Sequence, residues 1–223
     1  RYYAGRTPDP YVGTRRIVDD LASWIRANVP EDGRILFAGS AVHAYGRGHI
    51  AYLPIMTGRE MMACDYYGFP RGMVEMNYPP RAFRAQPDGC YAFARQHGVT
   101  HVISFRNSHI ACYRSEPEHF REVVTLVDRD EAANRDYVVF EVKDSGGRFA
   151  EGRGKVHADF NRISVDFGAE PPEMSVIRYN WSDRLKVSAP AALEPYDAGN
   201  GVVFIGIRPN GMSRVDIRYE SRF

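Results

Sequence analysis

The sequence has no long apolar run. No stretch approaches the ~18 consecutive apolar residues that a membrane-spanning helix needs, and no segment near the start has the pattern of a secretory signal peptide. The first residue is Arg1 rather than methionine, and a polar stretch with two prolines, residues 7–10, follows it. We therefore expect this chain to be part of a longer protein, with further residues before Arg1.

Cysteine is scarce, and neither sign of charge is in excess. The three cysteines, Cys64, Cys90 and Cys112, are too few and too widely spaced for a disulfide framework or a zinc set. The 29 basic and 28 acidic residues give a net charge of +1. Because nucleic-acid binding needs basic residues concentrated on one surface, this balance argues against nucleic acid as a partner.

Motifs of catalysis and cofactor binding are incomplete. Ser40 follows an apolar run but lacks the flanking glycines of G-x-S-x-G. The stretch 46–51 fits a relaxed G-x-G-x-x-A pattern, yet an apolar run follows it where the dinucleotide motif needs a helix. His97 and His101 are separated by Gly98 and the start of an apolar run, so they do not share a helix face. We predict no catalytic residue, no cofactor and no metal.

Residues 1–147 predict a small α/β domain with a mixed sheet and a few helices. Apolar residues at helical spacing, among them Ile17, Leu21 and Ile25, indicate an amphipathic helix that ends at Pro30. A short apolar strand follows, and the helix–strand order then repeats before two closing strands. The predicted elements are helices over 14–29 and 88–96, and strands over 34–38, 99–105, 118–127 and 135–142.

Residues 41–87 interrupt this pattern. Pro54, Pro70, Pro79 and Pro80 break the segment, which predicts a long ordered loop with a short strand near 51–53 and a short helix near 59–64. Long loops within compact domains are often functional.

Residues 148–223 predict an antiparallel, sandwich-like β domain, which makes the whole chain α+β. The stretch 144–148 is rich in glycine and marks the linker. After it the apolar period changes to two, as in Val215, Ile217 and Tyr219, with charged residues between them. Strand-like stretches cover 155–167, 174–187, 202–208 and 214–220.

Tyrosines and polar residues of the long loop are the candidate ligand contacts. Tyrosine rings beside polar groups can stack on sugars or lie at a membrane interface, although packing of the loop onto its own sheet is the commoner role for such tyrosines. Trp181 is a candidate of the same kind within the β domain. The candidate residues are His43, Tyr45, Arg59, Asp65, Tyr66, Tyr67 and Trp181.

The chain as a whole resembles the C-terminal soluble region of bacterial polytopic membrane proteins, the GT-C-type glycosyltransferases and their YfhO-like relatives. The resemblance runs from about residue 15 to the end. It is carried by the helix, proline, glycine and strand order over 21–37, the strand 97–103, the two closing strands 120–124 and 137–142, and the β-domain stretches 161–165, 179–181 and 209–219. Tyr179-Asn180-Trp181 stands where that family often has Pro-Gly-Trp.

This resemblance implies a domain that is not active alone. In that family the catalytic carboxylate lies in the membrane region, before the part matched here. It implies a non-catalytic domain at the extracytoplasmic, periplasmic face of the bacterial inner membrane, joined to the membrane through preceding spans. A glycan or polyprenyl-linked sugar is the implied ligand, with the loop over 41–80 as the first candidate contact.

Two other functions fit the residues. Carboxylates of the loop, such as Glu60 and Asp65, could perform acid–base hydrolysis of a sugar in a free-standing enzyme. Alternatively, an exposed sheet edge of the β domain could bind a protein partner.

Overall fold

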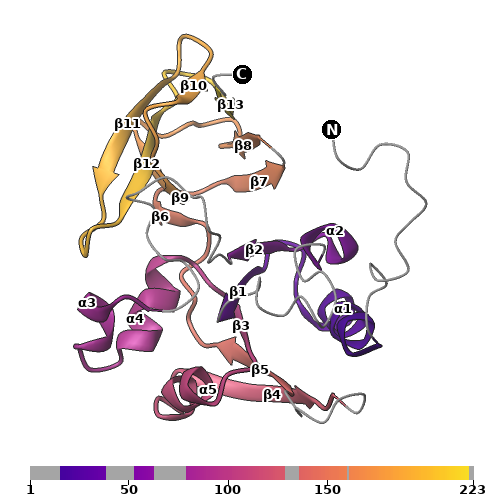
Figure 1. Cartoon of the computed structure of the whole chain (residues 1–223). Coiled ribbons are helices and arrows are strands. Elements are labelled where there is room, and N and C mark those ends of the chain that lie inside the picture. Colours follow the sequence, from indigo (N-terminus) through magenta and orange to yellow (C-terminus); the bar gives the residue numbers. More distant parts are fainter. Residues whose placement is uncertain (1–15, 39–52, 63–78, 129–135, 160, 221–223) are drawn as a thin grey trace. The chain divides into compact units, whose positions relative to one another are not determined.

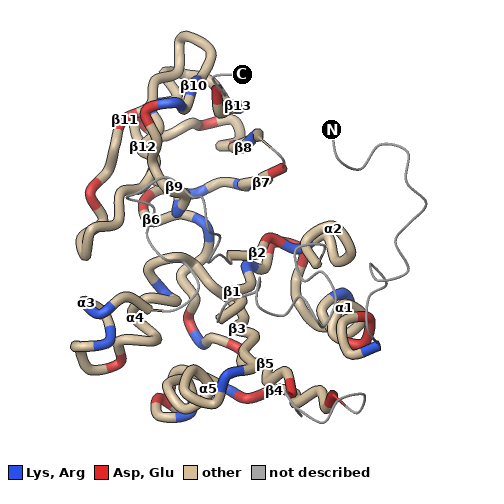
Figure 2. Tube along the Cα trace, viewed as in Figure 1, with Lys and Arg blue, Asp and Glu red and all other residues tan. Residues whose placement is uncertain are grey.

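The computed structural model describes residues 16–38, 53–62, 79–128, 136–159 and 161–220 (Figure 1). These residues pack as two compact units: one takes in residues up to 80 and 101–143, and the other takes in 81–100 and 144 onward. The predicted α+β class is confirmed, with a mixed sheet in the first unit and a sandwich-like pair of antiparallel sheets in the second. Basic and acidic residues are interleaved along both units (Figure 2).

The first unit is built on a five-stranded mixed sheet in the order β2-β1-β3-β5-β4. Strand β1, second in this order, pairs in parallel with β2 and β3, whereas β3, β5 and β4 pair antiparallel. Every residue of β1 is buried, as expected for a strand with neighbours on both sides. The strands are β1 (Arg34–Ala38), β2 (Glu60–Met62), β3 (His101–Ser104), β4 (Phe120–Leu126) and β5 (Tyr137–Val142).

Helix α1 (Arg16–Asn28) covers one face of this sheet. Its apolar stripe packs on alternate residues of the strands, because side chains of a strand point to opposite faces in turn. The resulting core contains Ile17, Val18, Leu21, Ala22, Ile25, Ile35, Phe37, Ile103, Phe105, Tyr137 and Val139. The predicted helix over 14–29 and the strand 34–38 are thus confirmed.

Helix α5 (Asn107–Arg114) packs against β4 and β5 (Figure 1). The ring of Tyr113 lies 5.0 Å from that of Phe120 and 5.6 Å from that of Phe140. The sequence did not predict this helix. Its first turn is polar, its four apolar residues follow one another instead of recurring at helical spacing, and no side chain caps its first turn.

The order of the two short elements near residue 55 is the reverse of the prediction. A helix, α2 (Leu53–Thr57), comes first and a strand, β2, comes second. Pro54 suits the first turn of a helix, where its missing N–H has no partner to lose. The Thr57 hydroxyl donates to the Leu53 carbonyl at 2.5 Å. The strand then forms because Glu60–Met62 pairs in parallel with β1.

The second unit contains two four-stranded antiparallel sheets, in the orders β10-β13-β8-β7 and β11-β12-β9-β6. Inward residues of both sheets share one core, which makes the arrangement a sandwich: Val165, Ile177, Ile205, Ile207, Val215 and Ile217 are buried together. The strands are β6 (Phe149–Glu151), β7 (Lys155–Asp159), β8 (Arg162–Asp166), β9 (Ser175–Asn180), β10 (Leu185–Val187), β11 (Ala192–Asp197), β12 (Val203–Arg208) and β13 (Arg214–Tyr219).

Helices α3 (Arg81–Arg84) and α4 (Gly89–Gln96) belong to this second unit. The ring of His97, just after α4, lies 4.5 Å from Phe93 and 5.9 Å from Phe204 of β12. The Gln96 amide donates to the Ala198 carbonyl at 2.9 Å. Residues 81–100 therefore fold with the sandwich, although the sequence pattern assigned them to the domain over 1–147.

Among the described residues, none of the helices has the length and apolar character required to cross a membrane.

Candidate ligand-binding hollows beside helix α1

Two hollows lie where α1 meets the edge strand β4. The first, which we call the Trp24 hollow, has a volume of about 320 Å³ and is lined by Trp24, Asn28, His101, Arg121, Glu122, Val123 and Glu141. The second, the Asp128 hollow, has a volume of about 330 Å³ and is lined by Arg16, Ile17, Asp20, Thr125, Leu126, Val127 and Asp128. Both volumes fall at the lower end of the range for small-molecule sites.

Strand register brings the polar residues of the Trp24 hollow together. His101 of β3 is directly opposite Glu141 of β5, and Glu141 is opposite Arg121 of β4. Directly opposed residues point to the same face. Here that face is the one α1 covers, since Ile103 and Val139 of the same strands belong to the α1 core. A row of three polar side chains therefore runs across the sheet beneath α1.

The indole of Trp24 forms the apolar wall of this hollow. Its ring lies edge-on to the imidazole of His101, with centroids 6.2 Å apart and planes inclined at 70°. Asn28, one turn further along α1, donates from Nδ2 to the Trp24 carbonyl at 2.8 Å. This bond fixes the amide and leaves its Oδ1 as an acceptor.

An ion pair also lines this hollow. The Arg121 guanidinium donates from Nε to Oε2 of Glu141 at 2.8 Å and from Nη2 to the same oxygen. Glu122 is held from another direction, because Arg114 of α5 donates to both of its oxygens at 2.9 and 3.1 Å. The hydrogen bond from Arg114 lowers the pKa of Glu122, and the Thr125 hydroxyl contributes to the same effect.

Burial favours the neutral form of the His101 imidazole. Only 8% of this residue is exposed. Loss of hydration lowers the pKa of His101 below its ordinary value of 6.5, and Arg121 lowers it further, while Glu141 acts in the opposite direction. A neutral imidazole offers one donor and one acceptor. The Trp24 hollow therefore presents an aromatic surface beside neutral, cationic and anionic hydrogen-bonding groups.

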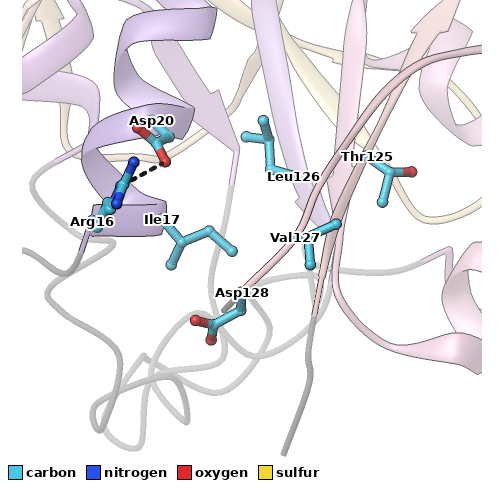
Figure 3. Close-up of a pocket in the computed structure, with 7 residues that line it drawn as sticks. All are labelled: Arg16, Ile17, Asp20, Thr125, Leu126, Val127 and Asp128. Carbon is cyan, nitrogen blue, oxygen red and sulfur yellow. Dashed lines mark ion pairs between the residues drawn. The ribbon is translucent and has the colours of Figure 1, made fainter. Parts of the chain in front are cut away.

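The Asp128 hollow is more apolar (Figure 3). The Ile17 side chain points from α1 toward the strand, whereas the Thr125 hydroxyl points away from the helix. Arg16 and Asp20 pair across one turn of α1 at 4.0 Å. Asp128 is buried, and its backbone N–H donates to Oδ1 of Asp136 at 3.2 Å. These contacts explain the shape of the hollow but supply few groups directed at a ligand.

The sequence-predicted ligand residues lie outside both hollows or outside the described residues. His43, Tyr45, Asp65, Tyr66 and Tyr67 all belong to the segments that the structure does not describe.

Arg59 and Trp181 are described, and each has a local contact. The Arg59 guanidinium donates from Nε to the Val29 carbonyl, just past the end of α1, at 2.9 Å. The Trp181 indole N–H donates to Oδ1 of Asp183 at 3.0 Å in the turn before β10. Both contacts are local hydrogen bonds and do not place either residue in a binding site. The ligand-binding role of Arg59 and Trp181 therefore stays a prediction.

Glu60, the described carboxylate of the hydrolase interpretation, has a structural partner. Nε of the buried Arg34 donates to Oε1 of Glu60 at 2.7 Å between the parallel strands β1 and β2. This carboxylate therefore balances the charge of the buried Arg34 guanidinium.

The residues of the Trp24 hollow were not identified from sequence. Trp24 lies within the predicted helix over 14–29 and was not singled out, and His101 was weighed only with His97 as a metal pair, which the sequence did not favour. The one indication in the sequence was that Trp24 and His101 each place a ring N–H on an otherwise apolar face, of a helix and of a strand respectively. Comparisons with protein-family models, curated proteins and solved structures found no match to this chain.

Proposed function

We propose that this chain is a non-catalytic, extracytoplasmic domain of a membrane glycosyltransferase-like protein, and that it binds a sugar residue in the Trp24 hollow. The observation that carries the binding role is the presence of an indole, a neutral imidazole and an Arg–Glu pair in one hollow of about 320 Å³. The resemblance of the sequence to GT-C-type and YfhO-like proteins supports the membrane context.

The chemistry of the hollow suits a pyranose. A sugar ring has an apolar C–H face that packs on aromatic rings, and hydroxyls that each donate and accept hydrogen bonds. Trp24 supplies the aromatic surface. Oδ1 of Asn28 and the oxygens of Glu141 supply acceptors, and Arg121 supplies planar donors that match neighbouring hydroxyls.

The same set of residues does not favour hydrolysis. A glycosidase needs two carboxyls about 5–10 Å apart, one of which must carry a proton. In this hollow, Arg121 holds Glu141 as its counter-ion, and Arg114 lowers the pKa of Glu122. Glu122 therefore favours the charged form, which suits hydrogen-bond acceptance better than proton donation.

The two tryptophans of the chain provide the test. We expect methyl glycosides of glucose, galactose, mannose and N-acetylglucosamine, titrated in turn, to change tryptophan fluorescence for at least one sugar. Trp181→Phe should keep that change, and Trp24→Phe should abolish it. Sorbitol, which has hydroxyls but no ring, is the control ligand.

Two outcomes would contradict the binding role. One is the absence of any saturable change for all four glycosides in the folded wild-type protein. The other is a change that survives Trp24→Phe and disappears in Trp181→Phe, which would move the site to the β domain as the sequence predicted.

A further inference from the structure

One sheet of the second unit, β10-β13-β8-β7, has a polar outer face. Residues of these strands alternate between the sandwich core and the outer face, because successive side chains of a strand point to opposite sides. Val156, Val165, Leu185 and Ile217 pack in the core. The charged residues between them in sequence therefore lie on the outer face.

Strand register arranges these charged residues in rows across the sheet. In one row, Lys155 of β7 and Arg214 of β13 are both opposite Asp166 of β8. Just past β13, the Glu220 backbone N–H donates to the Arg184 carbonyl at 3.0 Å, so Glu220 and Arg184 are opposed as well. Opposite charges attract across neighbouring strands. Each of these three cations therefore has an acid facing it.

One row is different, because three cations follow one another in it. Arg218 of β13 is directly opposite Arg162 of β8 on one side and Lys186 of β10 on the other. Arg162 has counter-ions: it is opposite Asp159, and its Nη2 donates to Oδ2 of Asp216 at 2.6 Å. Within the part of the chain that the structure describes, Arg218 and Lys186 have no ion-pair partner, and both are exposed. Like charges that face each other across strands are destabilising.

We propose that Arg218 and Lys186 form a subsite for a phosphate monoester. Such a group carries about two negative charges near neutral pH and three acceptor oxygens, so a single group can neutralise both side chains. A guanidinium matches two of these oxygens with parallel N–H donors, and an ammonium holds another as a point charge. A carboxylate carries one charge and therefore compensates only one of the two cations.

The other charges of the face favour a small ligand in solution over an anionic bilayer. Basic segments that recognise anionic lipids contain about four to eight Lys or Arg residues. Here two cations lack a counter-ion, and Asp159, Asp166 and Asp216 lie on the same face, where they repel a surface of anionic headgroups. The ligand class is therefore a soluble phosphate ester, such as a sugar phosphate.

The backbone amide signals of Lys186 and Arg218 provide the test. In a proton–nitrogen correlation spectrum of the whole chain, methyl phosphate should shift both signals in a saturable manner. Lys186→Gln and Arg218→Gln should each weaken this binding about tenfold, because each removes a charged hydrogen-bond donor. Lys155→Gln removes the same charge from a row that contains Asp166, and it should leave the dissociation constant unchanged.

Acetate at the same ionic strength is the control ligand, and it should produce no saturable shift at either position. The proposal is overturned if methyl phosphate shifts neither signal, if acetate shifts them equally, or if Lys155→Gln weakens binding as much as the other two variants. The spectrum also shows whether each variant is folded, so unfolding cannot be mistaken for loss of binding.

Vesicles that contain phosphatidylglycerol distinguish the source of the phosphate. We expect the chain not to sediment with them. Co-sedimentation that Lys186→Gln and Arg218→Gln abolish would assign these cations to a bilayer and overturn the soluble ligand. The subsite shares no residue with the Trp24 hollow, so a negative result here leaves the sugar-binding proposal as it stands.

Discussion

The imidazole of His101 meets the indole of Trp24 edge-on, with ring centroids 6.2 Å apart. Trp24 belongs to the helix that covers the sheet, and His101 belongs to a strand beneath it. Because an edge-on contact leaves much of an aromatic face uncovered, the indole still has a surface on which a ligand ring can pack. The pair therefore joins the structural core of the first unit to its candidate site.

Titration of His101 predicts a loss of stability in acid. Burial lowers the pKa of His101 in the folded chain below its ordinary value of 6.5. The unfolded chain therefore binds this proton more tightly, and the free energy of unfolding should fall as the pH drops below about 6.5. Denaturant unfolding of His101→Asn and wild type at several pH values should show a shallower decline in the variant.

His157→Asn is the matched control, since His157 is exposed on β7. We expect this control to keep the wild-type pH dependence. If His101→Asn and wild type lose stability in parallel between pH 7 and 5, the buried neutral imidazole is not the group responsible.

Removing one partner of the Arg34–Glu60 ion pair should lower the free energy of unfolding strongly. Arg34 is 2% exposed, so Glu60→Ala leaves a buried charge without its main compensation. We expect a loss on the order of 3 kcal/mol in the free energy of unfolding. The double variant Arg34→Met/Glu60→Met should lose less, because it removes both charges.

Glu31→Ala, at an exposed position before β1, provides the comparison and should change stability by less than about 0.5 kcal/mol. Equal losses for Glu60→Ala and the double variant would show that packing, rather than charge, accounts for the effect. Retention of sugar binding by Glu60→Ala would further separate this carboxylate from the site.

Alanine substitution at two glycines of the second unit should separate the cost of backbone strain from the cost of a steric clash. Gly98 and Gly147 have φ values of +63° and +66°, which side chains rarely adopt. A Cβ at Gly147 would meet no atom within 4 Å, whereas one at Gly98 would lie 2.1 Å from the Gly147 carbonyl oxygen. Gly147→Ala should cost about 1 kcal/mol, and Gly98→Ala should cost clearly more. Thermal unfolding of both variants measures this, and equal costs would contradict it.

The sequence predicted elements whose burial pattern is regular. Helix α1 was predicted because Ile17, Leu21 and Ile25 recur at helical spacing, and β13 because Val215 and Ile217 alternate with charges. Local pattern failed where packing decides the structure. Helix α5 is held by the contacts of Tyr113, and β11 pairs with β12 despite Pro195.

The candidate site could not be predicted from sequence spacing either, because packing between distant segments forms it. His101, Arg121 and Glu141 are twenty residues apart in succession, and antiparallel register alone brings them into one row. No spacing rule connects such residues, and Trp24 joins them only because α1 crosses that face. The ligand-binding site was instead predicted in the aromatic-rich loop, because the residues of that loop are close together in the chain.

Indole N–H resonances test the central claim most directly. The chain has two tryptophans, so a proton–nitrogen correlation spectrum shows two indole signals, which Trp181→Phe assigns. In a titration with the four methyl glycosides, we predict that at least one sugar shifts the Trp24 signal in a saturable manner and leaves the Trp181 signal in place. A Trp24 signal that does not move with any of the four, while the protein remains folded, would contradict sugar binding in the hollow.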